Sequence, residues 1–122
     1  MTPPIFPTCV ASAPVTALLG TNPTRLYPFD DAPQGVASPY AVWQMIPGGS
    51  PANNLADRPD MDAFSLQVDV YAASSTDVIA VAAALRDAIE PVATITRWGA
   101  QDTDPDTKHK HIGFDVDWYV PR

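Results

Sequence analysis

The sequence predicts an α+β fold, in which a mainly antiparallel sheet of four or five strands carries two helical segments packed on one face. Residues 64–71 alternate between apolar and polar side chains, which is typical of a strand with one buried face. A helical pattern over Ser75–Glu90 follows this strand directly. The 14 prolines favour short elements joined by stiff loops. With 122 residues, the chain is expected to form one domain, 1–122, with its own core.

The predicted helix at 75–90 has clear ends as well as an apolar side. Ser74 and Asp77 form a capping box, in which the serine oxygen accepts from first-turn amides and the aspartate lies at the positive end of the helix dipole. Pro91 ends the helix, because proline disfavours helical geometry in the residue before it. The apolar positions recur every three or four residues: Val78, Val81, Ala82, Leu85, Ala88 and Ile89. We expect this helix and the preceding strand to bury each other and to nucleate the core.

Three elements are predicted before this pair. Pro3–Leu19 reads as helical, with a break at Pro14. Arg25–Phe29 is a short extended segment, which its proline confines to a sheet edge or a strand end. Tyr40–Ile46 is apolar on both faces, which predicts a strand that is covered on both sides.

Two long loops and two strands complete the predicted sheet. Pro47–Met61 is expected to project as an extended hairpin loop. Ala93–Trp98 is a strand, and Gly99–His111 is a second long polar loop. Gly113–Val120 alternates cleanly and is the last strand. We expect one of the two loops to contact a partner protein or a neighbouring copy.

The sheet face turned away from the helices is predicted to carry carboxylates. Asp69 of the central strand and Asp115 and Asp117 of the last strand point to that face. If the two strands are neighbours, like charges lie opposite each other and destabilise an isolated subunit. A solvated face, a subunit interface and a divalent cation site are the three interpretations of this cluster. Mg²⁺ assisting oligomerisation is therefore the one cofactor that the sequence allows, since carboxylates suit hard cations.

Composition excludes several function classes. With a formal net charge of -7 and 7 basic residues, the chain lacks the clustered cations that hold nucleic acid. The longest apolar run, Val78–Leu85, is too short to span a bilayer, and the amino terminus does not read as a signal peptide. We expect synthesis in the cytosol, with the lone Cys9 as a buried apolar residue.

Motifs for catalysis or metal binding are incomplete. Asp102, Asp104 and Asp106 resemble the start of a calcium loop, but the glycine and glutamate that such a loop requires are absent. His109 and His111 lack the further Cys or His ligands that zinc takes. Neither a phosphate-binding loop nor a Gly-x-Ser-x-Gly elbow occurs. The sequence therefore predicts no catalytic, cofactor-binding or metal residues, and a protein that is not an enzyme.

A series of short motifs carries a resemblance to a known family. In order, they are Arg-Leu-Tyr-Pro (25–28), Ala-Pro-Gln-Gly (32–35), Pro-Tyr-Ala-Val-Trp-Gln (39–44), Pro-Asp-Met-Asp (59–62), Gln-Val-Asp-Val-Tyr-Ala (67–72), Leu-Arg-Asp-Ala-Ile (85–89) and Phe-Asp-Val-Asp-Trp (114–118). From about Pro14 to its end, the chain resembles the tail completion proteins of long-tailed phages and prophages. This is the tail terminator family related to the lambda-type protein U.

The resemblance implies a role in virion assembly. It implies a small α+β subunit that forms a homo-oligomeric ring, typically a hexamer, which caps the tail tube, stops its polymerisation and joins the head. The implied partners are the tail tube protein and the head–tail connector, and DNA passes through the lumen without specific binding. The implied location is the virion tail, after assembly in the bacterial cytoplasm. An acidic subunit suits this role, because like charge keeps phosphates off the ring wall.

Two other functions remain open from the residues alone. A head–tail neck adaptor would share the phage context and dock on the head side. A small-ligand-binding α+β module would have an apolar pocket and would stay monomeric.

Overall fold

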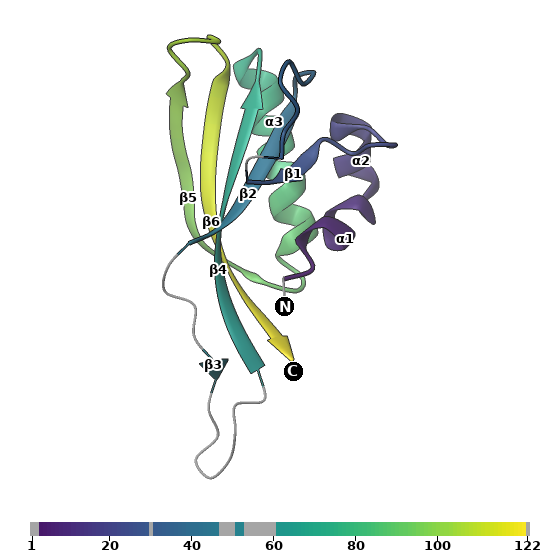
Figure 1. Cartoon of the computed structure of the whole chain (residues 1–122), viewed down its shortest axis with the longest axis vertical. Coiled ribbons are helices and arrows are strands. Elements are labelled where there is room, and N and C mark those ends of the chain that lie inside the picture. The colour runs from purple at the N-terminus through teal and green to yellow at the C-terminus, as the bar shows by residue number, and fades with distance from the viewer. Residues whose placement is uncertain (1–2, 30, 47–50, 53–60, 122) are drawn as a thin grey trace.

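The computed structural model describes residues 3–29, 31–46, 51–52 and 61–121. Its helices are α1 (Ile5–Val10), α2 (Ala13–Leu19) and α3 (Ser75–Ile89). Its strands are β1 (Leu26–Pro28), β2 (Tyr40–Ile46), β3 (Pro51–Ala52), β4 (Met61–Ala72), β5 (Thr94–Thr103) and β6 (Lys110–Pro121). The helices gather on one side of the sheet (Figure 1), which gives the predicted α+β architecture. Within the described chain, none of them has the length and apolar character needed to cross a membrane.

The sheet is mixed and has six strands. Their order is β1-β2-β4-β6-β5, and β3 pairs with β4 off this path. The β1–β2 pair is parallel, and every other pair is antiparallel. The prediction of four or five mainly antiparallel strands is therefore right in character but wrong in number. The two-residue β3 is too short to leave a periodic pattern in the sequence.

The core lies between the sheet and the helices. β4 pairs with β6 over its whole length, from Met61 opposite Pro121 to Ala72 opposite Lys110. The apolar positions of these two strands, the inner side of α3 and the first two helices form one cluster. Its largest fully buried members include Phe114, Ile5, Leu19, Leu26, Leu66, Leu85 and Ile89.

Helix α3 forms as predicted. The Ser74 hydroxyl accepts a hydrogen bond from the Asp77 backbone N–H at 3.2 Å, which confirms the cap. The helix ends at Ile89, with Glu90 as its C-cap, directly before Pro91. Sequence periodicity located this helix well because a cap, an apolar side and a terminating proline all agree.

Replacing Ser74 by alanine is expected to lower the free energy of unfolding by about 1 kcal/mol, because a first-turn amide loses its acceptor. Thermal unfolding followed by circular dichroism measures this change. Ser75→Ala is the matched control, since Ser75 is also exposed but lies inside the helix. Equal losses in both variants would contradict the capping role.

The first helical region breaks earlier than predicted. The break falls at Ala11 and Ser12, and Pro14 lies in the first turn of α2. Proline is tolerated at that place because first-turn amides have no acceptor within the helix. Gly20 ends α2 with a φ of 83°, a conformation that favours glycine.

The predicted loop over Gly99–His111 is wrong. β5 continues to Thr103 and β6 begins at Lys110, so only residues 104–109 connect them. The second half of β5 is polar because it forms a sheet edge, and two register shifts interrupt its pairing. Of the predicted loop Pro47–Met61, residues 47–50 and 53–60 lie outside the described residues.

The prediction that β2 is covered on both faces is also wrong: within this single chain, only one face of β2 is covered. Ala41 and Trp43 are buried on the helix side. Tyr40, Val42 and Gln44 point to the other face and are half-buried. No described element packs over that face (Figure 1), so apolar groups of β2 stay partly accessible.

Candidate functional site

The sheet face opposite the helices, which we term the open face, carries most of the polar groups of the sheet. The pairing registers assign its members: Tyr40, Val42, Gln44 and Ile46 of β2, Ser65, Gln67, Asp69 and Tyr71 of β4, His111, Gly113, Asp115, Asp117 and Tyr119 of β6, and Thr94, Arg97 and Asp102 of β5. Most of them are half-buried. The three carboxylates predicted for this face are among them.

The carboxylates do not lie opposite one another, which corrects the prediction. Across the β4–β6 pair, Asp69 faces Gly113, Asp115 faces Gln67 and Asp117 faces Ser65. β4 and β6 are neighbours as supposed, but their register offsets the like charges. The direct repulsion between opposed carboxylates is therefore absent from this strand pair.

Each of the three carboxylates also has a partner in its own chain. The contacts are Ser65 Oγ to Asp117 Oδ1 (2.9 Å), Gln67 Nε2 to Asp69 Oδ1 (3.3 Å) and the Arg97 guanidinium to an Asp115 oxygen (3.9 Å). Hydrogen bonds and an ion pair thus stabilise part of the negative charge within the chain. The structure separates the three residues along the sheet instead of collecting them into one site.

His111, which the sequence did not connect with Asp69, lies between two carboxylates on the open face. His111 Nε2 lies 2.7 Å from Asp69 Oδ1, and His111 Nδ1 lies 3.0 Å from Asp102 Oδ1. The Asp69 and His111 side chains are 17% and 15% exposed. A neutral imidazole donates to one of these carboxylates, and an imidazolium donates to both. Since both ring nitrogens lie within hydrogen-bonding distance of a carboxylate, the two contacts fix the orientation of the imidazole.

Gly113 makes this contact possible. A Cβ atom at position 113 would lie 3.0 Å from Asp69 Oδ1 and 3.6 Å from the His111 ring. The missing side chain leaves room for the Asp69 carboxylate to lean across β6 toward His111. A glycine inside an alternating strand is the one signal in the sequence that a close approach occurs there.

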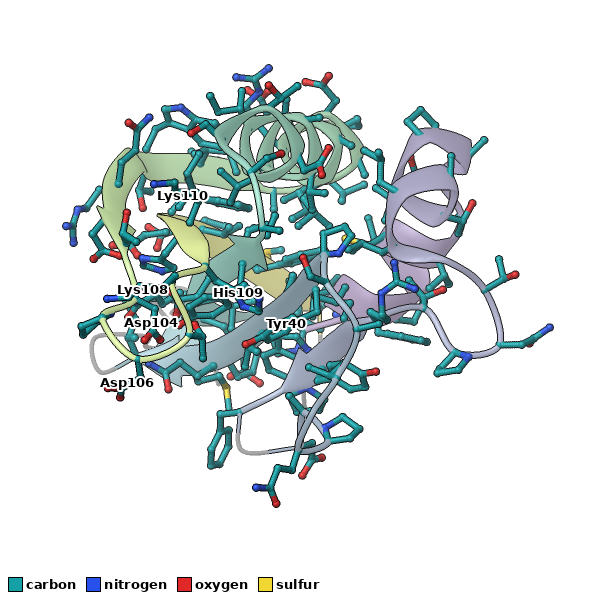
Figure 2. All side chains as sticks on the ribbon, turned by 90° about the horizontal axis from the view of Figure 1, so that it is seen from above. Tyr40, Asp104, Asp106, Lys108, His109 and Lys110 are labelled. Carbon is teal, nitrogen blue, oxygen red and sulfur yellow. The ribbon has the colours of Figure 1, made fainter. Side chains whose placement is uncertain are left out.

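Three aromatic rings form a row across the end of the open face near the 104–109 loop. Tyr40 stacks on Tyr71 at 5.2 Å between ring centroids, and Tyr71 stacks on His111 at 4.9 Å. His109 meets the edge of Tyr40 at 6.3 Å, and the two are close together in Figure 2. Burial, with the nearby Asp69 charge, raises the pKa of Tyr71 to about 12. Its phenol therefore stays neutral near pH 7.

The aspartates considered as a calcium loop belong to the turn between β5 and β6. Asp104 Oδ1 accepts the backbone N–H groups of Asp106 (2.8 Å) and Thr107 (3.2 Å). These two hydrogen bonds lower the pKa of Asp104, because they stabilise its charged form. Asp104 thus shapes the turn (Figure 2). In the part of the chain that the structure describes, no group of three or more Cys, His, Asp or Glu residues is arranged to hold a metal.

A cavity of about 240 Å³ lies between the start of α3 and the β5–β6 hairpin. Its lining mixes polar and apolar side chains: Ser75, Val78, Ile79, Gln101, Asp102, Thr103, Lys110, His111 and Ile112. A small-ligand-binding module was expected to have an apolar pocket, and this lining differs from that expectation.

Comparison with known proteins adds two findings. A family model described as "Tail completion protein gp17" matches residues 3–121. Among solved structures, 12 chains match. One belongs to the structure "Virion of native gene transfer agent (GTA) particle", with a TM-score of 0.66, 19% sequence identity, and coverage of 97% of this chain and 92% of that chain. At this identity the match shows a shared fold. The comparison with curated proteins gave no match.

Proposed function

The chain belongs to the tail completion protein gp17 family, and on that premise we propose that it acts as a tail terminator. In this role, copies of the chain close into a ring, expected to be a hexamer. The ring caps the tail tube, stops its polymerisation and offers the surface to which the head joins. The observation that carries the proposal is the family match over residues 3–121, which includes every described helix and strand.

The structural match supports a location in the virion tail. The matched chain is part of a virion particle, that of a gene transfer agent. By analogy, this chain would lie between the tail tube protein and the head–tail connector, after assembly in the host cytoplasm. A fold shared over nearly the full length of both chains is what a common position in such particles would require.

In the proposed ring, the open face is turned toward the lumen. Asp69, Asp115 and Asp117 would then line the path of the DNA. Carboxylates repel the phosphate backbone, so DNA would pass without being held. The chain as a whole has a formal net charge of -7, which favours the same outcome.

The proposed role is structural, not enzymatic. Burial raises the pKa of Cys9 to about 12, so its side chain is a thiol and not a reactive thiolate. His111 has both ring nitrogens engaged by Asp69 and Asp102. These side chains therefore serve packing and orientation in our proposal.

Removing the gene from the phage-like element that encodes the chain tests the proposal. Electron microscopy is expected to show tails of excessive and variable length beside filled, unattached heads. Expression of the wild-type chain from a plasmid should restore tails of uniform length that are joined to heads. Native mass spectrometry of the purified chain, with and without Mg²⁺, tests in addition whether the ring forms and whether the ion assists it.

Other outcomes would replace the proposal. Unjoined tails of normal length, together with binding of the purified chain to isolated heads, would identify a head–tail neck adaptor. Normal particles after gene removal would contradict both roles and leave the small-ligand module to be tested.

A further inference from the structure

We infer that neighbouring copies in the ring meet head to tail, with the β5 side of one sheet against the β1 side of the next. The ring itself rests on the proposed function, and the inference concerns which surfaces form it. The β5 surface consists of Ile79, Arg86, Val92, Arg97 and Trp98. The β1 surface consists of Phe6, Phe29, Asp31 and Met45.

The β5 side of the molecule carries exposed apolar side chains, which is the first observation that supports this contact. Ile79, Val92 and Trp98 are 52%, 56% and 44% exposed. Trp98 lies on β5, the outermost strand, and Val92 lies in the turn that leads from α3 into it. Ile79 of α3 lines the same cavity as Gln101 of β5. The three side chains thus follow one border of the molecule.

The opposite border carries a matching set. Phe29 is 58% exposed and directly follows β1, the other outermost strand. Met45 is 51% exposed, in the part of β2 that extends beyond its pairing with β1. Phe6 of α1 is 43% exposed and lines a cavity with residues 21–24, which lead into β1. Of the seven large exposed apolar side chains in the described chain, three thus lie on or beside β5 and α3, and three lie on β2, on α1 or directly after β1.

Trp98 has the features of an interface anchor. Its ring lies 5.2 Å from the ring of Phe114, and the Arg86 guanidinium lies 5.0 Å from its centroid. These contacts hold the indole in place while 44% of the residue remains accessible. A large aromatic side chain that is already ordered loses little entropy on binding, and tryptophan is enriched among the residues that dominate binding energy.

The edge strands indicate that side chains carry the contact. In β5, register shifts between Ile95 and Arg97 and between Trp98 and Ala100 interrupt the regular hydrogen-bonding pattern. β1 has three residues and ends at Pro28, which has no backbone N–H. Both features oppose the addition of a long regular strand. A second copy is therefore expected to pack its apolar groups against this border instead of extending the sheet ladder.

Charge on the two surfaces is complementary. Arg97 is next to Trp98 in the sequence, and its side chain is 69% exposed, with the Asp115 carboxylate of its own chain at 3.9 Å. Asp31, two residues after Phe29, is exposed on the other surface. Opposite charges beside apolar anchors favour contact between unlike surfaces over contact between like ones. Two different surfaces at opposite ends of a subunit give a heterologous contact, which forms a ring when the rotation between neighbours closes and does not form a two-fold dimer.

Two surface variants and their mixture test the inference. Trp98→Glu damages the β5 surface, and Phe29→Glu damages the β1 surface. In native mass spectrometry each variant alone is expected to lose the ring and remain monomeric. An equimolar mixture is expected to give a dimer and nothing larger, because each variant retains one intact and complementary surface. Tyr119→Glu is the control, since Tyr119 is 53% exposed on the open face, and it should retain the ring.

If the ring forms only on the tail tube, cross-linking in assembled tails tests the same interface. In the Phe29→Cys/Trp98→Cys double variant, mild oxidation should give a ladder of covalent oligomers up to the ring size. Each single-cysteine variant should give no product larger than a pair. If the wild-type chain forms a ring in solution, a ring in either glutamate variant or a monomeric mixture would overturn the interface. If it forms a ring only on the tube, the absence of a ladder from tails of normal length would overturn it. These outcomes concern the interface. The proposed terminator function itself would be contradicted by tails of normal length after removal of the gene.

Discussion

Replacing Phe114 by alanine is expected to lower the free energy of unfolding by about 3–5 kcal/mol. Phe114 is 1% exposed and lies in the middle of β6, opposite Val68 of β4. Its ring also supports Trp98 at the β5 border. Truncation removes buried apolar area and leaves a cavity between the sheet and α3, which a regular strand pair closes only in part.

Urea unfolding followed by circular dichroism measures this loss. Tyr119→Ala is the matched control on the same strand, because Tyr119 is 53% exposed and its truncation opens no cavity. We expect the control to cost less than about 1 kcal/mol. Similar midpoints for the two variants would show that Phe114 is not part of a close-packed core.

Above pH 9 the protein is expected to lose stability through Cys9. This residue is fully buried in α1, and burial raises the pKa of its thiol from 9.0 to about 12. The folded state retains the proton while the unfolded state releases it, so the stabilisation is complete below pH 9 and declines up to about pH 12. The expected loss is about 1.4 kcal/mol for each pH unit in this window.

Comparison with Cys9→Ala isolates this effect. The variant has no thiol to ionise, whereas Tyr71 and the other groups that titrate at high pH are the same in both proteins. Urea unfolding at pH 8 and pH 10 should show that the wild type loses about 1.4 kcal/mol more than the variant. Parallel losses in the two proteins would mean that the Cys9 thiol ionises in the folded state as readily as in the unfolded state.

Sequence patterns located the elements that have one buried side. β2, the buried half of β4 and α3 were predicted closely, because apolar periodicity and end signals agree in each of them. The family resemblance was confirmed by the match over residues 3–121. The second half of β5 was missed, since an edge strand with polar residues on both sides has the composition of a loop.

The open face was predicted only in part. Asp69, Asp115 and Asp117 do lie on it, but whether they oppose one another depends on the β4–β6 register, which alternation alone does not fix. The contact between Asp69 and His111 depends on the same register and on the space that Gly113 leaves. Side chains that are distant in the sequence meet there, so no local spacing could reveal the group.

The twelve consecutive residue pairs between β4 and β6 have a mechanical consequence. These two strands run along the length of the molecule (Figure 1). Antiparallel hydrogen bonds lie perpendicular to the strands, so a pull along the strands loads them all together, in shear. In the proposed role, a subunit that joins a tail tube to a head would carry tension of this kind. If the long axis of the sheet follows the tail, this strand pair would resist separation as a unit instead of unzipping bond by bond.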